Sequence, residues 1–338
     1  MNGYDLGVKL EIHPKSGKRP MAQRFNFASY VAVSGILFFG RLDSAAAEIK
    51  IPNGSFESPQ VLFVDTTLDS WQKSPKPDWY IEDAGFFWSQ LVGVFKNPAK
   101  VKSDHLDNCD GEQAVWLFAV PGVGIQQDAF TKDWDDPTPS GAFQHQILPN
   151  NFYSLTVGIN GGGGGMKTGV ALKLELYAIN HSSTQTIIAS TNLSHSLELF
   201  PNRTHLTEFT LRSAVFNENH PLTGQQLGIK ITSLANQDNQ GGYWVLDNLR
   251  LTHNSPPRIT KIQALHQHLE LTITSEPKSV LEIQGTDSFE SFSMPEHAWR
   301  TLNAWTNETG MDRFVDERPQ STKRFYRIAL PASTLKLP

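Results

Sequence analysis

The chain has 338 residues, of which 19% are charged and 10% aromatic, and its formal net charge is -5. A single hydrophobic core stops growing near about 250–300 residues, so this length predicts two domains. The low charge content favours short apolar strands joined by loops over exposed helices. Only one cysteine, Cys109, is present, which excludes a disulfide within the chain.

The first 47 residues resemble a secretory signal. Basic residues precede an uncharged stretch at 25–40, and three alanines follow at 45–47. The apolar run is shorter than the roughly 20 residues that span a bilayer, so we expect cleavage and no membrane insertion afterwards. Met21 stands where such a signal begins, so we expect the native start there. The protein is therefore predicted to be secreted or held at the cell surface.

Removal of this signal makes the chain more acidic. Residues 48–338 contain 23 basic and 31 acidic side chains, a net charge of -8. No basic cluster remains, which excludes nucleic acid and anionic lipid surfaces as partners.

Short runs of alternating apolar residues fill the chain from 49 to 252, and turn-rich segments separate them. Alternation with a period of two is typical of half-buried strands. Many such strands predict an all-β jelly-roll β-sandwich over residues 48–253. The clearest runs lie at 153–159, 172–176, 207–211, 227–231 and 245–251.

A second module follows a break in this pattern. The sequence Asn-Ser-Pro-Pro at 254–257 is a stiff linker signal. Further alternating runs at 269–273, 280–283 and 324–330 predict a second, smaller β-sandwich over residues 258–338.

Asp247 has the same strand parity as its apolar neighbours Val245, Leu249 and Leu251. A carboxylate that faces a core is costly unless it is paired or binds a metal. Near the first strand, a turn offers a second carboxylate and several other oxygens, which are the ligands that Ca²⁺ prefers. We therefore predict a structural Ca²⁺ site formed by Glu57, Asp247, Asn53 and Ser55. Alternatively, Asp247 caps a turn or accepts backbone amides.

Six of the eight tryptophans lie in the larger module. Trp116 and Trp244 stand in apolar strands, so we expect them in the core. The others lie in polar loops, where an indole face beside a carboxylate suits stacking on sugar rings. The same aromatic residues could instead pack a long loop onto the sandwich. The predicted ligand-binding residues are Trp71, Trp79, Trp88, Trp134, Asp78 and Glu82.

Three segments resemble the galactose-binding-like jelly rolls of bacterial carbohydrate-binding modules. They are IPNGSFESP, AVWLFAVPGVGIQQ and GGYWVLDNLRLT, within residues 48–253. The resemblance implies a structural calcium near Glu57 and Asp247. In the C-terminal part, SVLEIQGTDSF and KRFYRIAL resemble the fibronectin-III-like module of exported bacterial proteins, which implies a spacer or attachment element.

No metalloprotease motif, serine nucleophile elbow or cysteine–histidine arrangement is present in the sequence. We therefore expect a non-catalytic protein that binds carbohydrate or glycoconjugate through a calcium-stabilised jelly roll. One alternative is a structural surface or matrix protein whose two modules contact protein partners at the cell surface. A second alternative is an unrecognised glycoside hydrolase or lyase, whose two carboxylates would converge in a cleft.

Overall fold

The computed structural model describes residues 47–82, 85–131, 143–265, 268–275, 277–286, 299–317 and 324–329. In this part of the chain the regular elements are β-strands and one short 3₁₀ helix, η1. The all-β prediction is therefore confirmed. The expected signal at 1–47 lies almost wholly outside the described residues. None of the described residues forms a helix long and apolar enough to cross a membrane.

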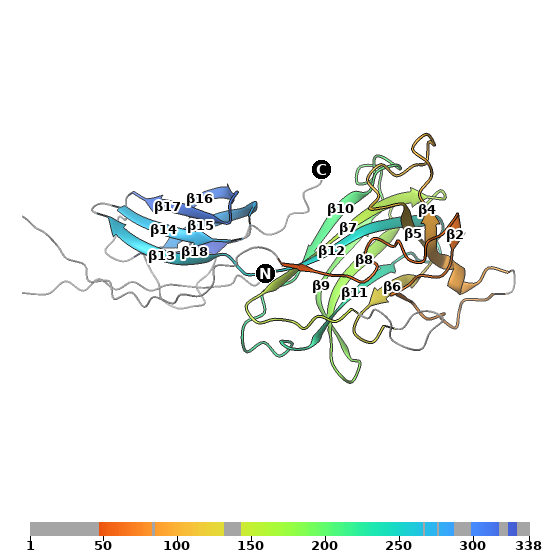
Figure 1. Cartoon of the computed structure of the whole chain (residues 1–338), viewed down its shortest axis with the longest axis horizontal. Helices are drawn as coiled ribbons and strands as arrows, with labels where there is room; N and C mark the ends of the chain where they lie inside the picture. The colour runs from red at the N-terminus through yellow and green to blue at the C-terminus, as the bar shows by residue number, and fades with distance from the viewer. Residues whose placement is uncertain are drawn as a thin grey trace, which may run out of the picture. The chain divides into compact units, whose positions relative to one another are not determined.

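Two compact units divide the chain, one covering Ala46–Pro256 and a smaller one that begins at Pro257. Each unit has its own core of strands, as Figure 1 shows. The change between the units falls within the predicted linker at 254–257.

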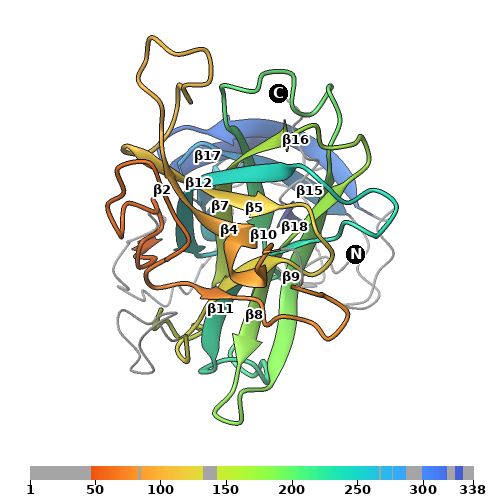
Figure 2. The same cartoon turned by 90° about the vertical axis from the view of Figure 1, so that its right-hand side faces the viewer.

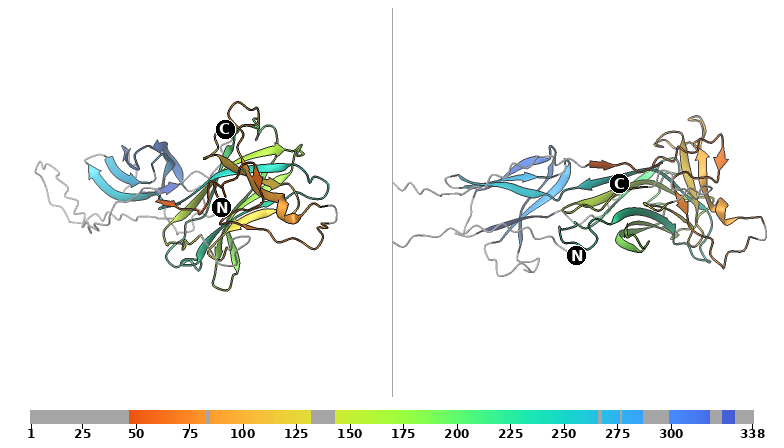
Figure 3. Two further views of the ribbon diagram at one scale, coloured as in Figure 1. Left: turned by 45° about the vertical axis from the view of Figure 1, so that its right-hand side comes forward. Right: turned by 60° about the horizontal axis from the view of Figure 1, so that its bottom comes forward.

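The larger unit consists of two facing antiparallel sheets, the arrangement of a jelly roll (Figures 1 and 3). The seven-stranded sheet has the order β10-β7-β12-β5-β4-β2, and β1 also pairs with β12. Its strands are β1 (Ala47–Ile49), β2 (Val64–Asp65), β4 (Val92–Lys96), β5 (Gln113–Phe118), β7 (Phe152–Gly163), β10 (Thr207–Arg212) and β12 (Tyr243–Asn254). Figure 2 shows β4 and β5 side by side in this sheet.

The second sheet of the larger unit has five strands in the order β3-β6-β11-β8-β9. These are β3 (Gln72–Lys73), β6 (Gly124–Gln127), β8 (Ala171–Ile179), β9 (Gln185–Ser194) and β11 (Gln226–Ser233), while η1 (Trp88–Leu91) precedes β4. The core between the two sheets contains the alternating residues that the sequence pattern identified, such as Leu155, Leu174 and Ile229. Alternation places every second side chain of a strand inward, so the sequence pattern alone was enough to assign these residues to the core.

The smaller unit consists of two three-stranded sheets, β13-β14-β17 and β16-β15-β18. Its strands are β13 (Arg258–Leu265), β14 (His268–Thr274), β15 (Ser279–Thr286), β16 (Arg300–Asn307), β17 (Met311–Asp316) and β18 (Phe325–Ala329). Side chains from β14, β15 and β18, among them Leu271, Leu281 and Tyr326, meet in its core. This is the predicted smaller sandwich; a fibronectin-III-like type remains a prediction.

Trp244 lies in the core, as expected, but Trp116 does not. On β5, Val115 and Leu117 point inward, so Trp116 points to the outer face of the sheet, where it is half-buried. Its ring lies across Gly93, where an added Cβ would come within 2.4 Å of it. The expectation for Trp116 was wrong because an apolar residue between two core residues on a strand faces the opposite side.

Candidate functional site

A bulge in β12 determines where Asp247 points. The pairing of β12 with β7 shifts register between Asp247 and Arg250, and Asn248 has a φ of 55°. Leu246 and Leu249 consequently both face the inner core, while Asp247 faces outward with Val245. The expectation that Asp247 shares a face with Leu249 and Leu251 was therefore wrong. An extra residue at a bulge shifts the alternation of every side chain beyond it.

Asp247 is nevertheless fully buried, because the connection between β4 and β5 covers this outer face. Leu106 of that connection packs against Val245 in a small second core. Asn108 fastens the covering segment, since its side chain exchanges hydrogen bonds of 2.8 Å with the backbone N–H and C=O of Leu206. The carboxylate thus lies beneath a folded loop and not in the main core.

Glu57 and Asp247 bind the same covering segment from two sides. The backbone N–H of Asp110 donates to Asp247 Oδ2 at 2.6 Å. The backbone N–H groups of Glu112 and Gln113 donate to Glu57 Oε1 at 2.9 and 2.8 Å. The Glu57 carboxylate approaches Gly111 so closely that a Cβ there would lie 2.5 Å from Oε1.

The turn that carries Glu57 reaches β12 directly at the bulge. The backbone N–H of Leu249 donates to the carbonyl of Gly54 at 3.0 Å. This brings together the two ends of the larger unit that sequence reasoning joined through Glu57 and Asp247.

The chemistry of this junction fits a hard cation. Among the described residues, Asp247 Oδ1 is buried and has no hydrogen-bond partner. Burial raises the pKa of Asp247 to about 7, and burial together with nearby Asp247 raises the pKa of the Cys109 thiol. The described residues contain no group of three or more acidic, histidine or cysteine side chains arranged around a metal position. Two carboxylates alone would leave an ion at this junction to take its remaining ligands from backbone carbonyls and water.

Asn53 bonds to the backbone around the turn that carries Glu57. Its Nδ2 donates to the carbonyls of Ser58 at 2.6 Å and Asp69 at 2.8 Å, and its Oδ1 accepts from the N–H of Ser58. The side chain thus holds its own turn together, and its predicted role as a ligand stays a prediction. Ser55 is half-buried in the same turn, and its predicted role stays a prediction.

A second candidate surface is formed by aromatic side chains of residues 74–82 and 85–91, which we call the aromatic loop. Trp79 is 45% exposed, and its ring packs edge-on against Tyr80 at 5.8 Å and Trp88 at 6.1 Å. Large apolar side chains beside it are also exposed: Ile81, Phe86 and Phe87. The buried Trp88 holds this arrangement in place, since its Nε1 donates to the carbonyl of Ser74 at 2.8 Å.

The predicted ligand-binding residues separate into three groups. Trp79 and Asp78 are exposed, and Glu82 is half-buried and accepts the N–H of Trp88 at 2.7 Å. Trp71 and Trp88 are buried, so they cannot stack on a ligand, which corrects both assignments. Trp71 packs 5.5 Å from Phe56 and donates through Nε1 to the carbonyl of Asn53. Trp134 lies outside the described residues.

Sequence reasoning missed a polar group on the outer face of the five-stranded sheet. The ring of Tyr177 crosses Gly228, where a Cβ would lie 2.3 Å from it, and its hydroxyl donates to Asp128 Oδ2 at 2.6 Å. Glu175 on the same strand pairs with Lys173 Nζ at 2.6 Å. The sequence could have indicated this group, because these residues alternate with the core leucines of β8 and so lie on the opposite face of the strand.

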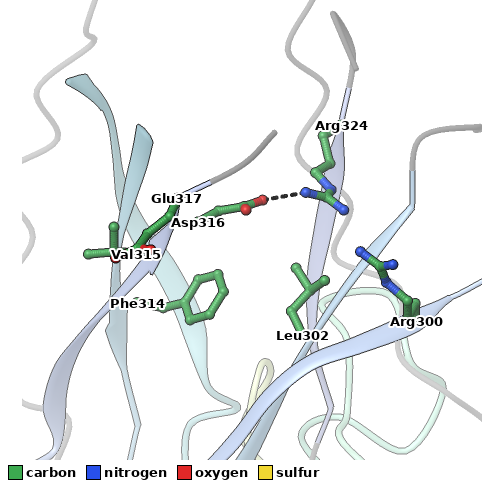
Figure 4. A pocket seen from close by; sticks show the side chains of 7 residues that line it. All are labelled: Arg300, Leu302, Phe314, Val315, Asp316, Glu317 and Arg324. Atoms are coloured by element: carbon green, nitrogen blue, oxygen red, sulfur yellow. Dashed lines mark hydrogen bonds and ion pairs between the residues drawn. The ribbon is translucent and has the colours of Figure 1, made fainter. Parts of the chain in front are cut away.

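It also missed a hollow of about 420 Å³ in the smaller unit. There the Arg324 guanidinium pairs with Asp316 Oδ2 at 2.7 Å, and both side chains are buried (Figure 4). Sequence reasoning used Arg324 only as the start of a strand. The hollow is lined by Arg300, Leu302, Phe314, Val315, Asp316, Glu317 and Arg324.

Comparison with known families identifies the larger unit. The model of the HpiC1-like family, described as HpiC1 cyclase, matches residues 47–252. The chain belongs to the HpiC1-like family. This match overturns the expectation of a non-catalytic protein, because the family model describes a cyclase. Motif searches missed it, since they looked for hydrolase and metal signatures and not for a cyclase. No curated protein matches the chain significantly.

Solved structures with similarity to this HpiC1-like chain include cyclases and carbohydrate-binding modules. The cyclase Fisc from Fischerella sp. TAU, in complex with (3Z)-3-(1-methyl-2-pyrrolidinylidene)-3H-indole, is 20% identical, with a TM-score of 0.44, covering 63% of this chain and all of that one. The CBM22-1 xylan-binding domain of Xyn10C from Paenibacillus barcinonensis is 10% identical, with a TM-score of 0.33, covering 63% of this chain and 98% of that one.

Proposed function

We propose that the larger unit is a cyclase-type enzyme whose substrate lies against the exposed side chains of the aromatic loop. The family match over residues 47–252 carries this proposal. Trp79 is 45% exposed, and near-perpendicular contacts with Tyr80 and Trp88 position its ring. Rigid aromatic surfaces with a few polar groups are what ligand sites use to hold and orient a ring.

Glu82 is our candidate for proton transfer during ring closure. Its Oε1 is fixed by the N–H of Trp88, and Trp88 also contacts Trp79, so the carboxylate is placed relative to the stacking surface. A positioned carboxylate can donate or accept a proton as bonds rearrange in the substrate. Asp78 is exposed next to Trp79 and supplies a second carboxylate for orienting hydrogen bonds.

We propose carbohydrate or glycoconjugate as the substrate class. The supporting feature is the adjacent exposed pair Asp78 and Trp79, which combines an acceptor for hydroxyl groups with a face for the C–H side of a sugar ring. A planar indole-type ligand would use the same face through stacking but would not need the carboxylate.

The experiment compares the wild-type chain with Trp79→Ala and the matched control Ile187→Ala, which truncates a similarly exposed apolar side chain on β9. Binding is measured on a glycan array and, separately, with the indole ligand named above. We expect glycan binding by the wild type and the control, and at least about tenfold weaker binding by Trp79→Ala.

A glycan that binds is then incubated with wild type and Glu82→Gln, and a cyclised product is sought by chromatography and mass spectrometry. Formation of product by the wild type and its loss in Glu82→Gln would support the assignment. Equal binding by Trp79→Ala and wild type would contradict it. Binding of the indole ligand but of no glycan would overturn carbohydrate as the substrate class. It would still support the aromatic loop as the binding surface.

We further propose that Ca²⁺ stabilises the junction of Glu57 and Asp247, with the chemistry of a structural ion, and that the protein is exported by its N-terminal segment. The buried, unpartnered Asp247 Oδ1 supports the ion.

For the smaller sandwich we propose the role of a fibronectin-III-like spacer or attachment element toward protein partners at the cell surface. Retention of a chain without residues 1–47 inside the cell, with release of the full chain, would support export.

A further inference from the structure

Two histidines face each other at the end of the larger unit where the chain leaves it. His253 lies near the end of β12, opposite Ala47 of β1 and Tyr153 of β7. His145 comes from a segment that pairs with the start of β11, in the other sheet, through the bridge between Gln146 and Gln226. The two imidazole centroids are 5.6 Å apart, with ring planes inclined by 33°.

The surroundings leave nitrogen atoms of this pair available. His145 Nε2 is buried without a hydrogen-bond partner among the described residues, which is costly for a polar atom. The His145 ring is held by an edge-on contact with Tyr153 at 5.6 Å. His253 Nδ1 lies 3.3 Å from Asn151 Oδ1, which fixes that ring and leaves its Nε2 without a partner in the described structure.

From this geometry we propose that His145 and His253 form a binding site for a borderline divalent transition-metal ion such as Zn²⁺, Ni²⁺ or Cu²⁺, which clamps the two sheets together. Metal–nitrogen bonds of about 2.0–2.1 Å and a tetrahedral angle place two ligated ring centroids roughly 5–5.5 Å apart. The observed centroid separation of 5.6 Å is close to this spacing. Water completes the coordination, and imidazole selects these ions over Ca²⁺ and Mg²⁺.

The protonation state of the pair agrees with this assignment. Burial and the neighbouring His253 lower the pKa of His145 to about 4, and burial lowers the pKa of His253. Neutral imidazole is the form that binds metal, so protons do not compete at neutral pH. A ligand that binds only the folded state raises its stability.

The test uses the full chain without an affinity tag. Ca²⁺ is kept in excess, so that added Zn²⁺ or Ni²⁺ does not bind at the junction of Glu57 and Asp247. Melting temperature and calorimetric binding are measured with Zn²⁺ and Ni²⁺, with Mg²⁺ as the negative probe. Variants are His145→Gln, His253→Gln and the double substitution. The matched control is His181→Gln, which changes an exposed imidazole in the loop between β8 and β9.

We expect one Zn²⁺ per chain, a higher melting temperature with Zn²⁺, and at least about a tenfold loss of affinity in each single variant. Cu²⁺ bound to the wild type should show coupling to two imidazole nitrogens in its electron paramagnetic resonance spectrum, a signature that a purely structural role would not produce. Far-ultraviolet circular dichroism with a chelator confirms that the variants are folded. Zn²⁺ binding that survives the double substitution, or that is lost in His181→Gln, would overturn the proposal, as would its absence from the wild type.

Discussion

The two units of the protein treat a buried carboxylate in opposite ways. In the smaller unit, Asp316 receives a hydrogen bond from Arg324 Nη1 at 2.7 Å and another from the Tyr326 hydroxyl at 2.8 Å. In the larger unit, Asp247 receives the backbone N–H of Asp110, while its Oδ1 has no partner among the described residues. One unit pairs its buried acid with an arginine, whereas the other holds its buried acid through a backbone N–H.

The largest effect is expected from breaking the pair in the smaller unit. Asp316→Ala leaves the Arg324 guanidinium buried without its carboxylate, which should lower the free energy of unfolding by about 3–5 kcal/mol. Urea unfolding is followed by hydrogen exchange in peptides from β13 to β18, because fluorescence also reports the six tryptophans of the larger unit. The neighbouring Glu317→Gln, which changes an exposed carboxylate, should stay within about 0.5 kcal/mol. Equal losses in both variants would contradict the role of the buried pair.

The second effect concerns the cation proposed for the larger unit. Ca²⁺ at a hundredfold excess over its dissociation constant should stabilise the chain by about 2.7 kcal/mol, and chelation should remove this gain. Asp247→Asn should abolish the response, because the substitution removes the charge that attracts the ion. Glu112→Gln is the control, since it alters an exposed carboxylate on the same segment. A melting temperature that chelation leaves unchanged in the wild type would rule out the ion.

The smallest effect concerns Asp128. Its partner is a neutral phenol, which is intermediate between the arginine that pairs with Asp316 and the backbone N–H that bonds to Asp247. Tyr177→Phe removes the hydroxyl that donates to Asp128 and should cost about 1–3 kcal/mol. Tyr243→Phe removes a hydroxyl from a half-buried ring without a hydrogen-bond partner in the described structure, so it should be nearly neutral. Thermal unfolding of the pair measures the difference. If Tyr177→Phe leaves the stability unchanged, the hydrogen bond from the backbone N–H of Phe130 is sufficient for the Asp128 carboxylate.

The sequence predicted the strands far better than the sites. Leu172, Leu174 and Leu176 were assigned to one inner face from alternation alone, and the structure places all three in the core. Alternation failed at Asp247, because a bulge at Asn248 changes which face the following residues occupy. Local composition failed at Trp71 and Trp88, since their polar neighbours in the chain suggested exposure, whereas both rings are buried in the structure.

The sequence by itself determined the all-β class and the alternating inner faces of the strands in the larger unit. These features follow from local periodicity and turn residues, which are visible along the chain. Tertiary structure decided which acids are buried, which tryptophans reach solvent and that His145 meets His253. The contact of His145 with His253 joins residues more than a hundred positions apart, and it depends on bulges and loop conformations that periodicity does not encode.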